Sequence, residues 1–267
     1  MRWDPGQYLR FGDARARPFA DLMARVPAEA PDLVVDLGCG PGNLTRTLAE
    51  RWPGADVVGV DSSAEMVERA LADGDGPRLG FEVGDLSEWA PDRPVDVLTS
   101  NATLQWVPGH LDLLPQLVSA VRPGGWLAFQ VPGNFSEPTH TVLADLLQEP
   151  RWRARLAGID LESPYSEEPS SYLAALVALG CSADVWETTY LQMLEGPDAI
   201  VSWMTGTGLR PVLGVLDDAE HQEFLAQYRE RVSPAYPEQD VGTVLPYRRI
   251  FAVAQRRHLE PLSLSAD

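Results

Sequence analysis

The chain has 267 residues, of which 45% are hydrophobic and 22% are charged, so it is long and apolar enough to bury one substantial core. All 21 of its basic residues are arginine, 39 residues are acidic, and the formal net charge is −18. Such a charge disfavours nucleic acid and anionic membranes as partners, because both are themselves negative.

The sequence shows neither a membrane span nor a secretory signal. No stretch approaches the ~18–20 apolar residues that cross a bilayer, and the first residues, MRWDP, open no apolar signal region. Cys39 and Cys181 are the only cysteines and stand far apart, which predicts two reduced thiols and no bound metal. We therefore expect a cytoplasmic protein.

The first half of the chain alternates short apolar runs with helical patterns, which is typical of strand, helix, strand units in a parallel sheet. The pattern opens with a helix and then places each Gly-rich or polar turn between a strand and the next helix. The expected helices are 15–26, 44–51, 64–72 and 111–121, and the expected strands are 33–37, 56–60, 79–83, 95–99 and 126–131, the last one after a turn at Gly124-Gly125.

Beyond Pro132 the pattern becomes mainly helical, with helices expected at 141–148, 172–179 and 219–232. Two further strands are expected near 182–194 and 247–255, and they could form an antiparallel hairpin at the edge of the sheet. We expect a single domain over 1–267. Its parts would be an N-terminal helical lid (1–30), a cofactor-binding core (31–132), helical cap insertions (133–181 and 195–243) and late strands (182–194 and 244–257).

The most informative motif is the segment VVDLGCGPGN at residues 34–43, where Asp36 closes a strand and glycines follow at alternate positions. Glycine permits a left-handed backbone and lets a ligand lie against the main chain. A P-loop is excluded because it needs a lysine, and the dinucleotide fingerprint G-x-G-x-x-G would need glycine where Asn43 stands. The plain alternative is a tight turn between a strand and a helix.

The G-x-G-x-G spacing after Asp36 resembles motif I of the Rossmann-like class I methyltransferases. That resemblance implies an α/β fold with a mostly parallel seven-stranded sheet, helices on both faces and an antiparallel last strand. It also implies S-adenosylmethionine as the cofactor, which carries an ammonium and a sulfonium and no phosphate. An acidic residue beside the loop suits such a cation.

Further cofactor contacts are expected at the ends of the following strands. Asp61, which is 61 − 36 = 25 residues after Asp36, would bind the ribose hydroxyls, although NAD enzymes use the same device and a helix N-cap is the alternative. Asp85 would lie near the adenine or cap a helix, and Met66 would touch the adenine or pack in the core. The expected cofactor residues are Tyr8, Asp36, Gly38, Gly40, Asn43, Asp61, Ser62, Met66, Asp85, Leu86 and Asn101.

The whole chain resembles the trans-aconitate 2-methyltransferase family, through the segments WDP (3–5), Gln105-Trp106, EPTH (137–140), TGTGLRP (205–211) and RIF (249–251). The resemblance implies methyl transfer from S-adenosylmethionine to a carboxylate of trans-aconitate, with a monomethyl ester and S-adenosylhomocysteine as products. A carboxylate is already ionised at neutral pH, so no general base is expected and catalysis would rest on positioning.

A polycarboxylate substrate must be held by concentrated positive charge despite the overall charge of −18. Arginine matches a carboxylate through two parallel hydrogen bonds, and tyrosine and histidine can add single ones. For each arginine the alternative is an ordinary surface ion pair, and for Trp106 it is core packing. The expected substrate residues are Trp106, His140, Tyr190, Arg210, Tyr247, Arg248 and Arg249.

Three other functions remain open on the sequence. The first is a methyltransferase for another small acid or natural product, since only the cap would choose the acceptor. An NAD-dependent oxidoreductase is the second, weakened by Asn43 at the third-glycine position. The third is a binding module for S-adenosylmethionine without catalysis, against which the aromatic and arginine residues of the cap argue.

Overall fold

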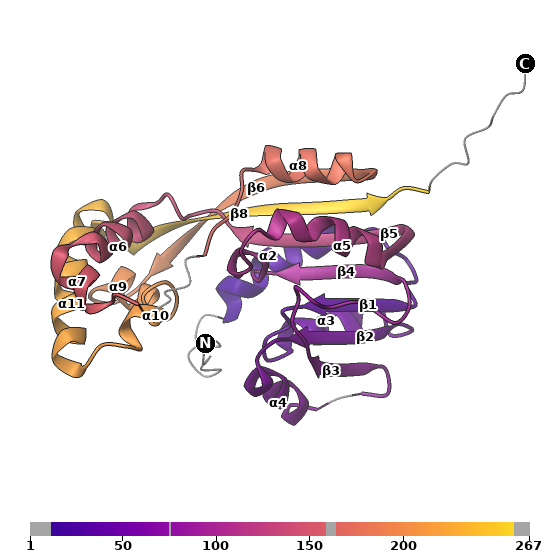
Figure 1. The fold of residues 1–267 in the computed structure, drawn as a ribbon, viewed down its shortest axis with the longest axis horizontal. Coiled ribbons are helices and arrows are strands. Elements are labelled where there is room, and N and C mark those ends of the chain that lie inside the picture. The colour runs from indigo at the N-terminus through magenta and orange to yellow at the C-terminus, as the bar shows by residue number, and fades with distance from the viewer. Residues whose placement is uncertain (1–11, 75, 159–163, 259–267) are drawn as a thin grey trace, which may run out of the picture. The chain divides into compact units, whose positions relative to one another are not determined.

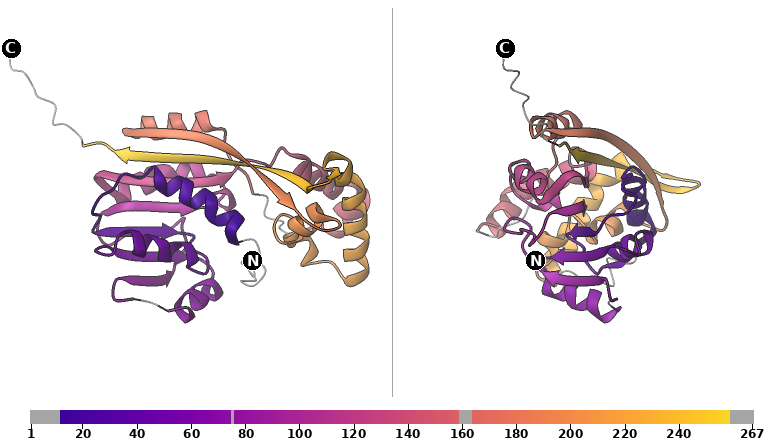
Figure 2. Two further views of the ribbon diagram at one scale, coloured as in Figure 1. Left: turned by 180° about the vertical axis from the view of Figure 1, so that it is seen from behind. Right: turned by 90° about the vertical axis from the view of Figure 1, so that its right-hand side faces the viewer.

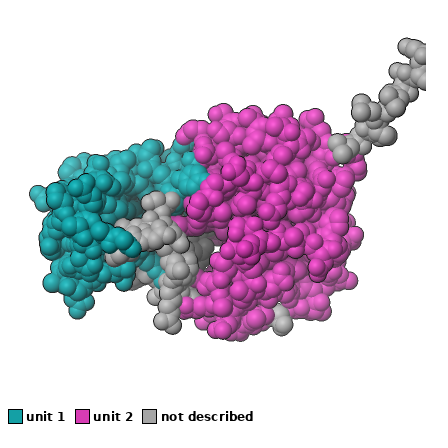
Figure 3. Space-filling view, viewed as in Figure 1, with its two compact units in different colours: residues 1–14, 132–166, 187–249 teal, residues 15–131, 167–186, 250–267 magenta. Residues whose placement is uncertain are grey.

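The computed structural model describes residues 12–74, 76–158 and 164–258, and their contacts divide the chain into two compact units. Unit 1 comprises residues 1–14, 132–166 and 187–249, and unit 2 comprises residues 15–131, 167–186 and 250–267 (Figure 3). Tyr172 and Leu176, which lie in the predicted cap segment 133–181, are part of the core of unit 2. That predicted segment is therefore shared between the two units.

The sheet contains seven main strands in the order β3-β2-β1-β4-β5-β8-β6. Strands β1 to β5 pair in parallel where they are neighbours, and the arrow of β8 in Figure 1 runs opposite to that of β4. The predicted mostly parallel sheet with an antiparallel last strand is confirmed. The strands are β1 (Leu33–Leu37), β2 (Asp56–Asp61), β3 (Leu79–Val83), β4 (Val95–Asn101), β5 (Val121–Pro132), β6 (Cys181–Leu194) and β8 (Gly242–Arg256).

Strand β8 lies between β5 and β6, so the two late strands are neighbours at the edge of the sheet, as expected. Strand β5 begins at Val121, so the turn expected at Gly124-Gly125 is wrong. A Cβ on Gly125 would lie 2.8 Å from the Asp96 carbonyl oxygen, so glycine here allows β5 to approach β4 at an irregular step in their register.

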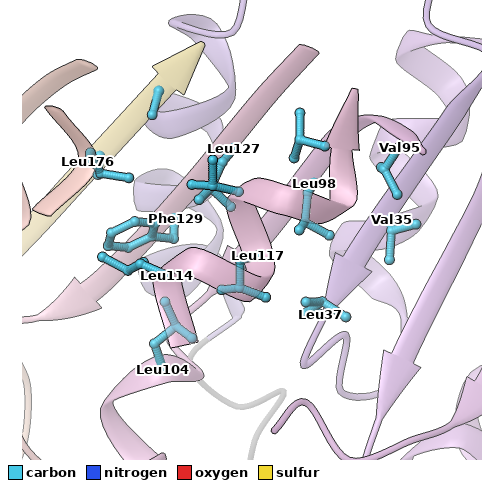
Figure 4. Close-up of a cluster of buried hydrophobic side chains, with 14 of the residues drawn as sticks. Val35, Leu37, Val95, Leu98, Leu104, Leu114, Leu117, Leu127, Phe129 and Leu176 are labelled. Carbon is cyan, nitrogen blue, oxygen red and sulfur yellow. The ribbon is translucent and has the colours of Figure 1, made fainter. Parts of the chain in front are cut away.

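Helices cover both faces of the sheet in unit 2. Leu117 of α5 and Leu176 of α8 join one hydrophobic cluster with Leu98 and Phe129 of the sheet (Figure 4). Helix α2 lies on the opposite face (Figures 1 and 2). The helices are α2 (Gly12–Ala24), α3 (Asn43–Arg51), α4 (Ala64–Ala72), α5 (Leu114–Ala120) and α8 (Pro169–Ala178), with 3-10 turns η1 (Leu104–Trp106) and η2 (His110–Leu113).

Unit 1 is mainly helical and has its own core. Trp152 and Phe224 meet edge to face with their rings 4.9 Å apart, and both are fully buried. Asp217 and Glu220 form a capping box at the start of the longest helix, which stabilises its first turn. The elements are α6 (Pro138–Gln148), α7 (Pro150–Arg155), α9 (Ala199–Thr205), α10 (Arg210–Leu213), α11 (Asp218–Val232), η3 (Ser233–Ala235) and the two-residue strand β7 (Glu238–Gln239), which pairs with β8.

Within residues 12–74, 76–158 and 164–258, none of the helices is both long and apolar enough to span a bilayer. In the same ranges, no three or more His, Cys, Asp or Glu side chains are grouped so that they could hold a metal ion.

Candidate functional site

The Gly-rich loop after β1 is fixed by Asp61 at the end of β2. The amides of Gly38 and Cys39 both donate to the Val60 carbonyl oxygen, at 2.7 and 3.0 Å. The Gly40 amide donates to Asp61 Oδ2 at 2.8 Å, and Asp61 Oδ1 accepts from the Ser63 amide at 2.9 Å. Asp61 therefore holds the loop and the start of α4 together, while each of its oxygens keeps a further lone pair for a ligand hydroxyl.

The three glycines of the loop differ in what surrounds them. All have positive φ, at 79°, 55° and 78° for Gly38, Gly40 and Gly42, which favours glycine at each position. A Cβ on Gly38 would collide with the Thr103 side chain, and one on Gly42 would lie 2.6 Å from the Phe81 ring. Among the residues that the structure describes, nothing lies within 4 Å of a Cβ placed on Gly40, so the main chain that is open to a ligand is at Gly40.

Asp36 is a buried carboxylate with one oxygen left over. Its exposed fraction is 2%, and its Oδ2 accepts a hydrogen bond of 2.6 Å from the Thr45 hydroxyl. Its Oδ1 is buried and has no hydrogen-bond partner among the described residues. Burial raises the pKa of Asp36 to about 6, with a smaller contribution from the Asp61 charge and an opposing one from Thr45. A cationic group fits this oxygen.

The end of β4 is attached to the same loop. The Thr103 hydroxyl lies 3.4 Å from the Gly38 carbonyl oxygen and 3.3 Å from that of Asn101, both of which can accept from it. Asn101 is buried, and its Oδ1 accepts from Gln130 Nε2 at 2.6 Å. The structure thus brings Asp36, Asp61 and Asn101 together around the glycine loop, and their contacts with a cofactor stay predictions.

Sequence reasoning missed the residues that hold these groups. Thr45, the partner of Asp36, stands nine residues further along, on the first turn of α3. Thr103 and Gln130 reach their partners only through the fold. Thr45 is a buried polar residue in the first turn of the helix that follows the loop, and its burial is visible only in the structure.

The other predicted cofactor residues have no described contact with this group. Asn43 and Ser62 are exposed, whereas Met66 and Leu86 are buried, at 3% and 7%. Asp85 is exposed and accepts from the Ser87 hydroxyl and amide, which lowers its pKa. Tyr8 lies outside the described residues. Their roles stay predictions.

In unit 1, His140 lies beside the segment 205–211 that the sequence also singles out. A Cβ on Gly208 would be 3.6 Å from His140 Nε2, and His140 Nδ1 is 3.1 Å from the Thr139 hydroxyl. The His140 ring also meets Phe135 edge to face, with centroids 5.2 Å apart. Burial lowers the pKa of His140 to about 4, so its imidazole is neutral at physiological pH.

A second group in unit 1 centres on Tyr247. The Trp203 ring meets the Tyr247 ring edge to face at 5.6 Å, and the Arg249 guanidinium lies over the Tyr247 ring at 4.3 Å. Arg249 is only 3% exposed, which is rare for an arginine and places a permanent positive charge inside this unit.

The structure does not bring Arg248 into that group. Neighbouring residues of a strand point to opposite faces, and Arg248 donates to Glu187 Oε2 at 3.0 Å through Nε and at 2.5 Å through Nη2. Tyr190 is buried at 6%, Arg210 begins α10 half-buried, and Trp106 is half-buried in η1 of unit 2. Arg248 is thus held by Glu187, and its role toward the substrate stays a prediction.

Comparison with solved structures agrees with the fold. The YcgJ protein of Bacillus subtilis has a TM-score of 0.61 at 15% identity, covering 91% of this chain and 99% of that one. An S-adenosylmethionine dependent methyltransferase of Mesorhizobium loti has a TM-score of 0.53 at 21% identity, again covering 91% of this chain and 99% of that one. At these identities the likeness concerns the fold alone.

Sequence comparison assigns the family. A family model described as "Methyltransferase domain" matches residues 34–125. A trans-aconitate 2-methyltransferase of Streptomyces avermitilis is 53% identical over 260 residues, covering 95% of this chain and 97% of its own. Enzymes of the same name in Streptomyces coelicolor and Mycolicibacterium gilvum are 51% and 47% identical, covering 95% of this chain and 86% and 98% of theirs. The chain belongs to the trans-aconitate 2-methyltransferase family.

Proposed function

We propose that this protein transfers the methyl group of S-adenosylmethionine to a carboxylate of trans-aconitate, releasing a monomethyl ester and S-adenosylhomocysteine. The observation that carries the proposal is identity of 46–53% with enzymes of that name across 95% of the chain. This span includes the segments 137–140 and 205–211 as well as the glycine loop, so it covers the part of the chain that would choose the acceptor.

The residues present in unit 2 fit the cofactor. Gly40 offers open main chain, and the unpartnered Oδ1 of buried Asp36 suits a hydrogen bond from the ammonium of the methionine moiety. Asp61 has lone pairs for the ribose hydroxyls, and Asn101 lies at the end of the neighbouring strand. When bound, S-adenosylmethionine supplies an electrophilic methyl group on a sulfonium.

The protein's part in the reaction is to bind and orient. The acceptor carboxylate is ionised at neutral pH, so no side chain has to remove a proton before attack. A buried cation at Arg249, the Tyr247 hydroxyl and the neutral His140 imidazole are the groups in unit 1 that suit a polycarboxylate. Catalysis then comes from holding one oxygen in line with the methyl group.

The test is release of S-adenosylhomocysteine by the purified protein with S-adenosylmethionine and one of trans-aconitate, cis-aconitate, citrate or no acceptor. We expect turnover with trans-aconitate well above the other three. Turnover only with a different small acid would replace the acceptor and keep the methyltransferase. Binding of S-adenosylmethionine without turnover on any acid would refute the proposal. The net charge of −18 supports a small molecule, and not nucleic acid, as the acceptor.

A further inference from the structure

Besides Asp36 Oδ1, unit 2 contains another buried acceptor without a hydrogen-bond partner, just after the end of β4. Gln105, in η1, is 4% exposed, and its Oε1 has no partner among the described residues. Its Nε2 donates to the Ala102 carbonyl oxygen at 2.6 Å. Because a carbonyl oxygen can only accept, this bond fixes which end of the side-chain amide is the nitrogen. The open end of Gln105 is therefore an oxygen.

The turn that Gln105 holds has a strained backbone. Ala102 has a φ of 55°, in the left-handed region that a residue with a Cβ rarely adopts. Its amide donates to the Gln130 carbonyl oxygen at 2.9 Å, and its carbonyl oxygen accepts from Gln105. Such a conformation persists only where surrounding contacts hold it, and it is concentrated at binding sites. These two hydrogen bonds keep Gln105 in a fixed place after β4.

Contacts place this turn beside the end of β1, where Asp36 lies. Strands β1 and β4 pair in parallel, so their carboxyl ends are next to each other. The Ser100 hydroxyl donates to the Leu37 carbonyl oxygen at 2.9 Å, and the Thr103 side chain fills the space that a Cβ on Gly38 would need. The two open acceptor oxygens therefore lie at the carboxyl-terminal side of neighbouring strands, next to the glycine loop.

The chemistry of these two oxygens indicates the kind of group that completes them. Both are acceptors, so a carboxylate, which offers only acceptors, would leave them unsatisfied. A protonated amine offers three N–H groups and a positive charge, and can therefore bond to a carboxylate and to an amide oxygen at once. Leaving a buried acceptor without a partner is unfavourable, and native proteins do so rarely. The pair of oxygens fits an ammonium group.

We propose that Gln105 is a cofactor-binding residue whose Oε1 accepts a hydrogen bond from the ammonium of S-adenosylmethionine, an inference that rests on the proposed function. Asp36 Oδ1 accepts from another N–H of the same ammonium and supplies the negative charge. A neutral amide oxygen completes the ammonium without burying one more charge beside Asp36 and Asp61, where a further carboxylate would add repulsion. Gln105 thus makes binding depend on the amino group of the cofactor.

The experiment measures, by calorimetry, the binding of S-adenosylhomocysteine and of its deaminated analogue, in which hydrogen replaces the amino group. Gln105→Met removes the acceptor oxygen and keeps the length of the side chain. We expect it to weaken binding of S-adenosylhomocysteine about 10- to 100-fold, as for the loss of a hydrogen bond to a charged group, and to weaken binding of the analogue much less. The matched control is Gln116→Met on α5, which breaks a similar bond, 2.7 Å from Nε2 to the Trp89 carbonyl oxygen, and should change neither affinity.

A second variant separates contact with the ammonium from support of the turn. Gln105→Glu keeps an oxygen in the place of Oε1, so it should bind S-adenosylhomocysteine more tightly than Gln105→Met does. Equal weakening of both ligands in Gln105→Met, in a protein whose wild type methylates trans-aconitate, would mean that Gln105 only supports the turn; it would overturn this inference and leave the proposed function intact. A wild type that neither binds S-adenosylhomocysteine nor methylates trans-aconitate would overturn both.

Discussion

Replacing Asp36 with asparagine should make the cofactor-free protein more stable and should weaken binding of the cofactor. The carboxylate is buried, only one of its oxygens has a hydrogen-bond partner among the described residues, and burial raises its pKa from 3.8 to about 6. Asparagine keeps an oxygen that can accept from Thr45 but carries no charge. Asp36→Asn therefore removes the cost of burying the charge together with the group that suits the cofactor's ammonium.

The size of the gain follows from linkage between protonation and folding. A pKa that is raised in the folded protein means that folding costs free energy once the group is ionised, so this carboxylate destabilises the fold above the folded pKa. The shift from 3.8 to about 6 corresponds to about 3 kcal/mol at pH 8, at 1.36 kcal/mol per pKa unit. At pH 5 the cost falls to about half, because most of the Asp36 side chains are then protonated in the folded state.

The assay is urea unfolding of cofactor-free wild type and Asp36→Asn at pH 8 and at pH 5. We expect the variant to be more stable by about 2–3 kcal/mol at pH 8 and by about half as much at pH 5. The control is Asp85→Asn, an exposed carboxylate whose pKa is lowered by Ser87, which should bring no gain at either pH. Equilibrium dialysis should show the variant binding S-adenosylmethionine about 10- to 100-fold more weakly, as for a lost hydrogen bond to a charged group.

Either of two results would refute the reasoning. An Asp36→Asn protein that is less stable than the wild type at pH 8 would mean that the carboxylate has a compensating partner in the folded state. A gain that is the same at pH 8 and pH 5 would show that packing, and not ionisation, is responsible. Unchanged affinity for S-adenosylmethionine would remove Asp36 from the cofactor site while leaving the stability argument in place.

Four further predictions concern pH, packing and charge. The affinity for S-adenosylmethionine can be measured by calorimetry between pH 5 and 7.5. In the wild type it should fall about tenfold per pH unit below pH 6, because Asp36 becomes protonated. In Asp36→Asn the affinity should not change with pH. Gly42→Ala should lower the free energy of unfolding in urea by about 3 kcal/mol, because Gly42 has a φ of 78° and a Cβ there would lie 2.6 Å from the Phe81 ring. A loss below about 1 kcal/mol would mean that the ring moves aside. Arg249→Leu should raise the KM for trans-aconitate, and Arg248→Leu, which breaks a partly exposed ion pair, should leave it unchanged. Added salt should raise kcat/KM for trans-aconitate, because protein and substrate are both negative, and a decrease would contradict long-range repulsion.

The strands of unit 2 could be predicted because their sequence pattern has one interpretation. Leu33–Leu37 is buried at all five positions, and a short apolar run closed by a glycine turn is typical of a parallel strand covered on both faces. Glycine at 124 and 125 misled the prediction of β5, because the same residue that makes a turn also allows two strands to approach closely. That distinction depends on the partner strand and is absent from the local sequence.

The short helices of unit 1 were harder to predict. Helix α9 is apolar on nearly every side, with five of its seven residues buried, so no amphipathic period marks it. Helix α10 is four residues long and contains Pro211, and α7 begins at a proline directly after the end of α6. Packing within the unit, and not local propensity, determines these elements.

The contrast between local sequence patterns and packing in the fold also explains which parts of the site could be predicted. Gly40 and Asp61 act through main-chain geometry at the ends of adjacent parallel strands, so spacing along the chain is enough to place them. Thr45 and Gln130, which donate hydrogen bonds to Asp36 and Asn101, lie in no motif, so their relation to the loop becomes visible only in the fold.

The residues around the glycine loop are negatively charged, whereas unit 1 contains a buried positive charge, and each suits one of the two proposed ligands. Around the glycine loop, the carboxylates of Asp36 and Asp61 suit a cationic cofactor, and because burial raises the pKa of Asp36, the cofactor-free protein bears the cost of that charge. In unit 1, a buried arginine and the neutral imidazole of His140 suit an anion. A cation such as S-adenosylmethionine relieves the buried carboxylate when it binds. Binding of the cofactor therefore removes the free-energy cost of the buried charge, and this relief contributes to the cofactor's affinity.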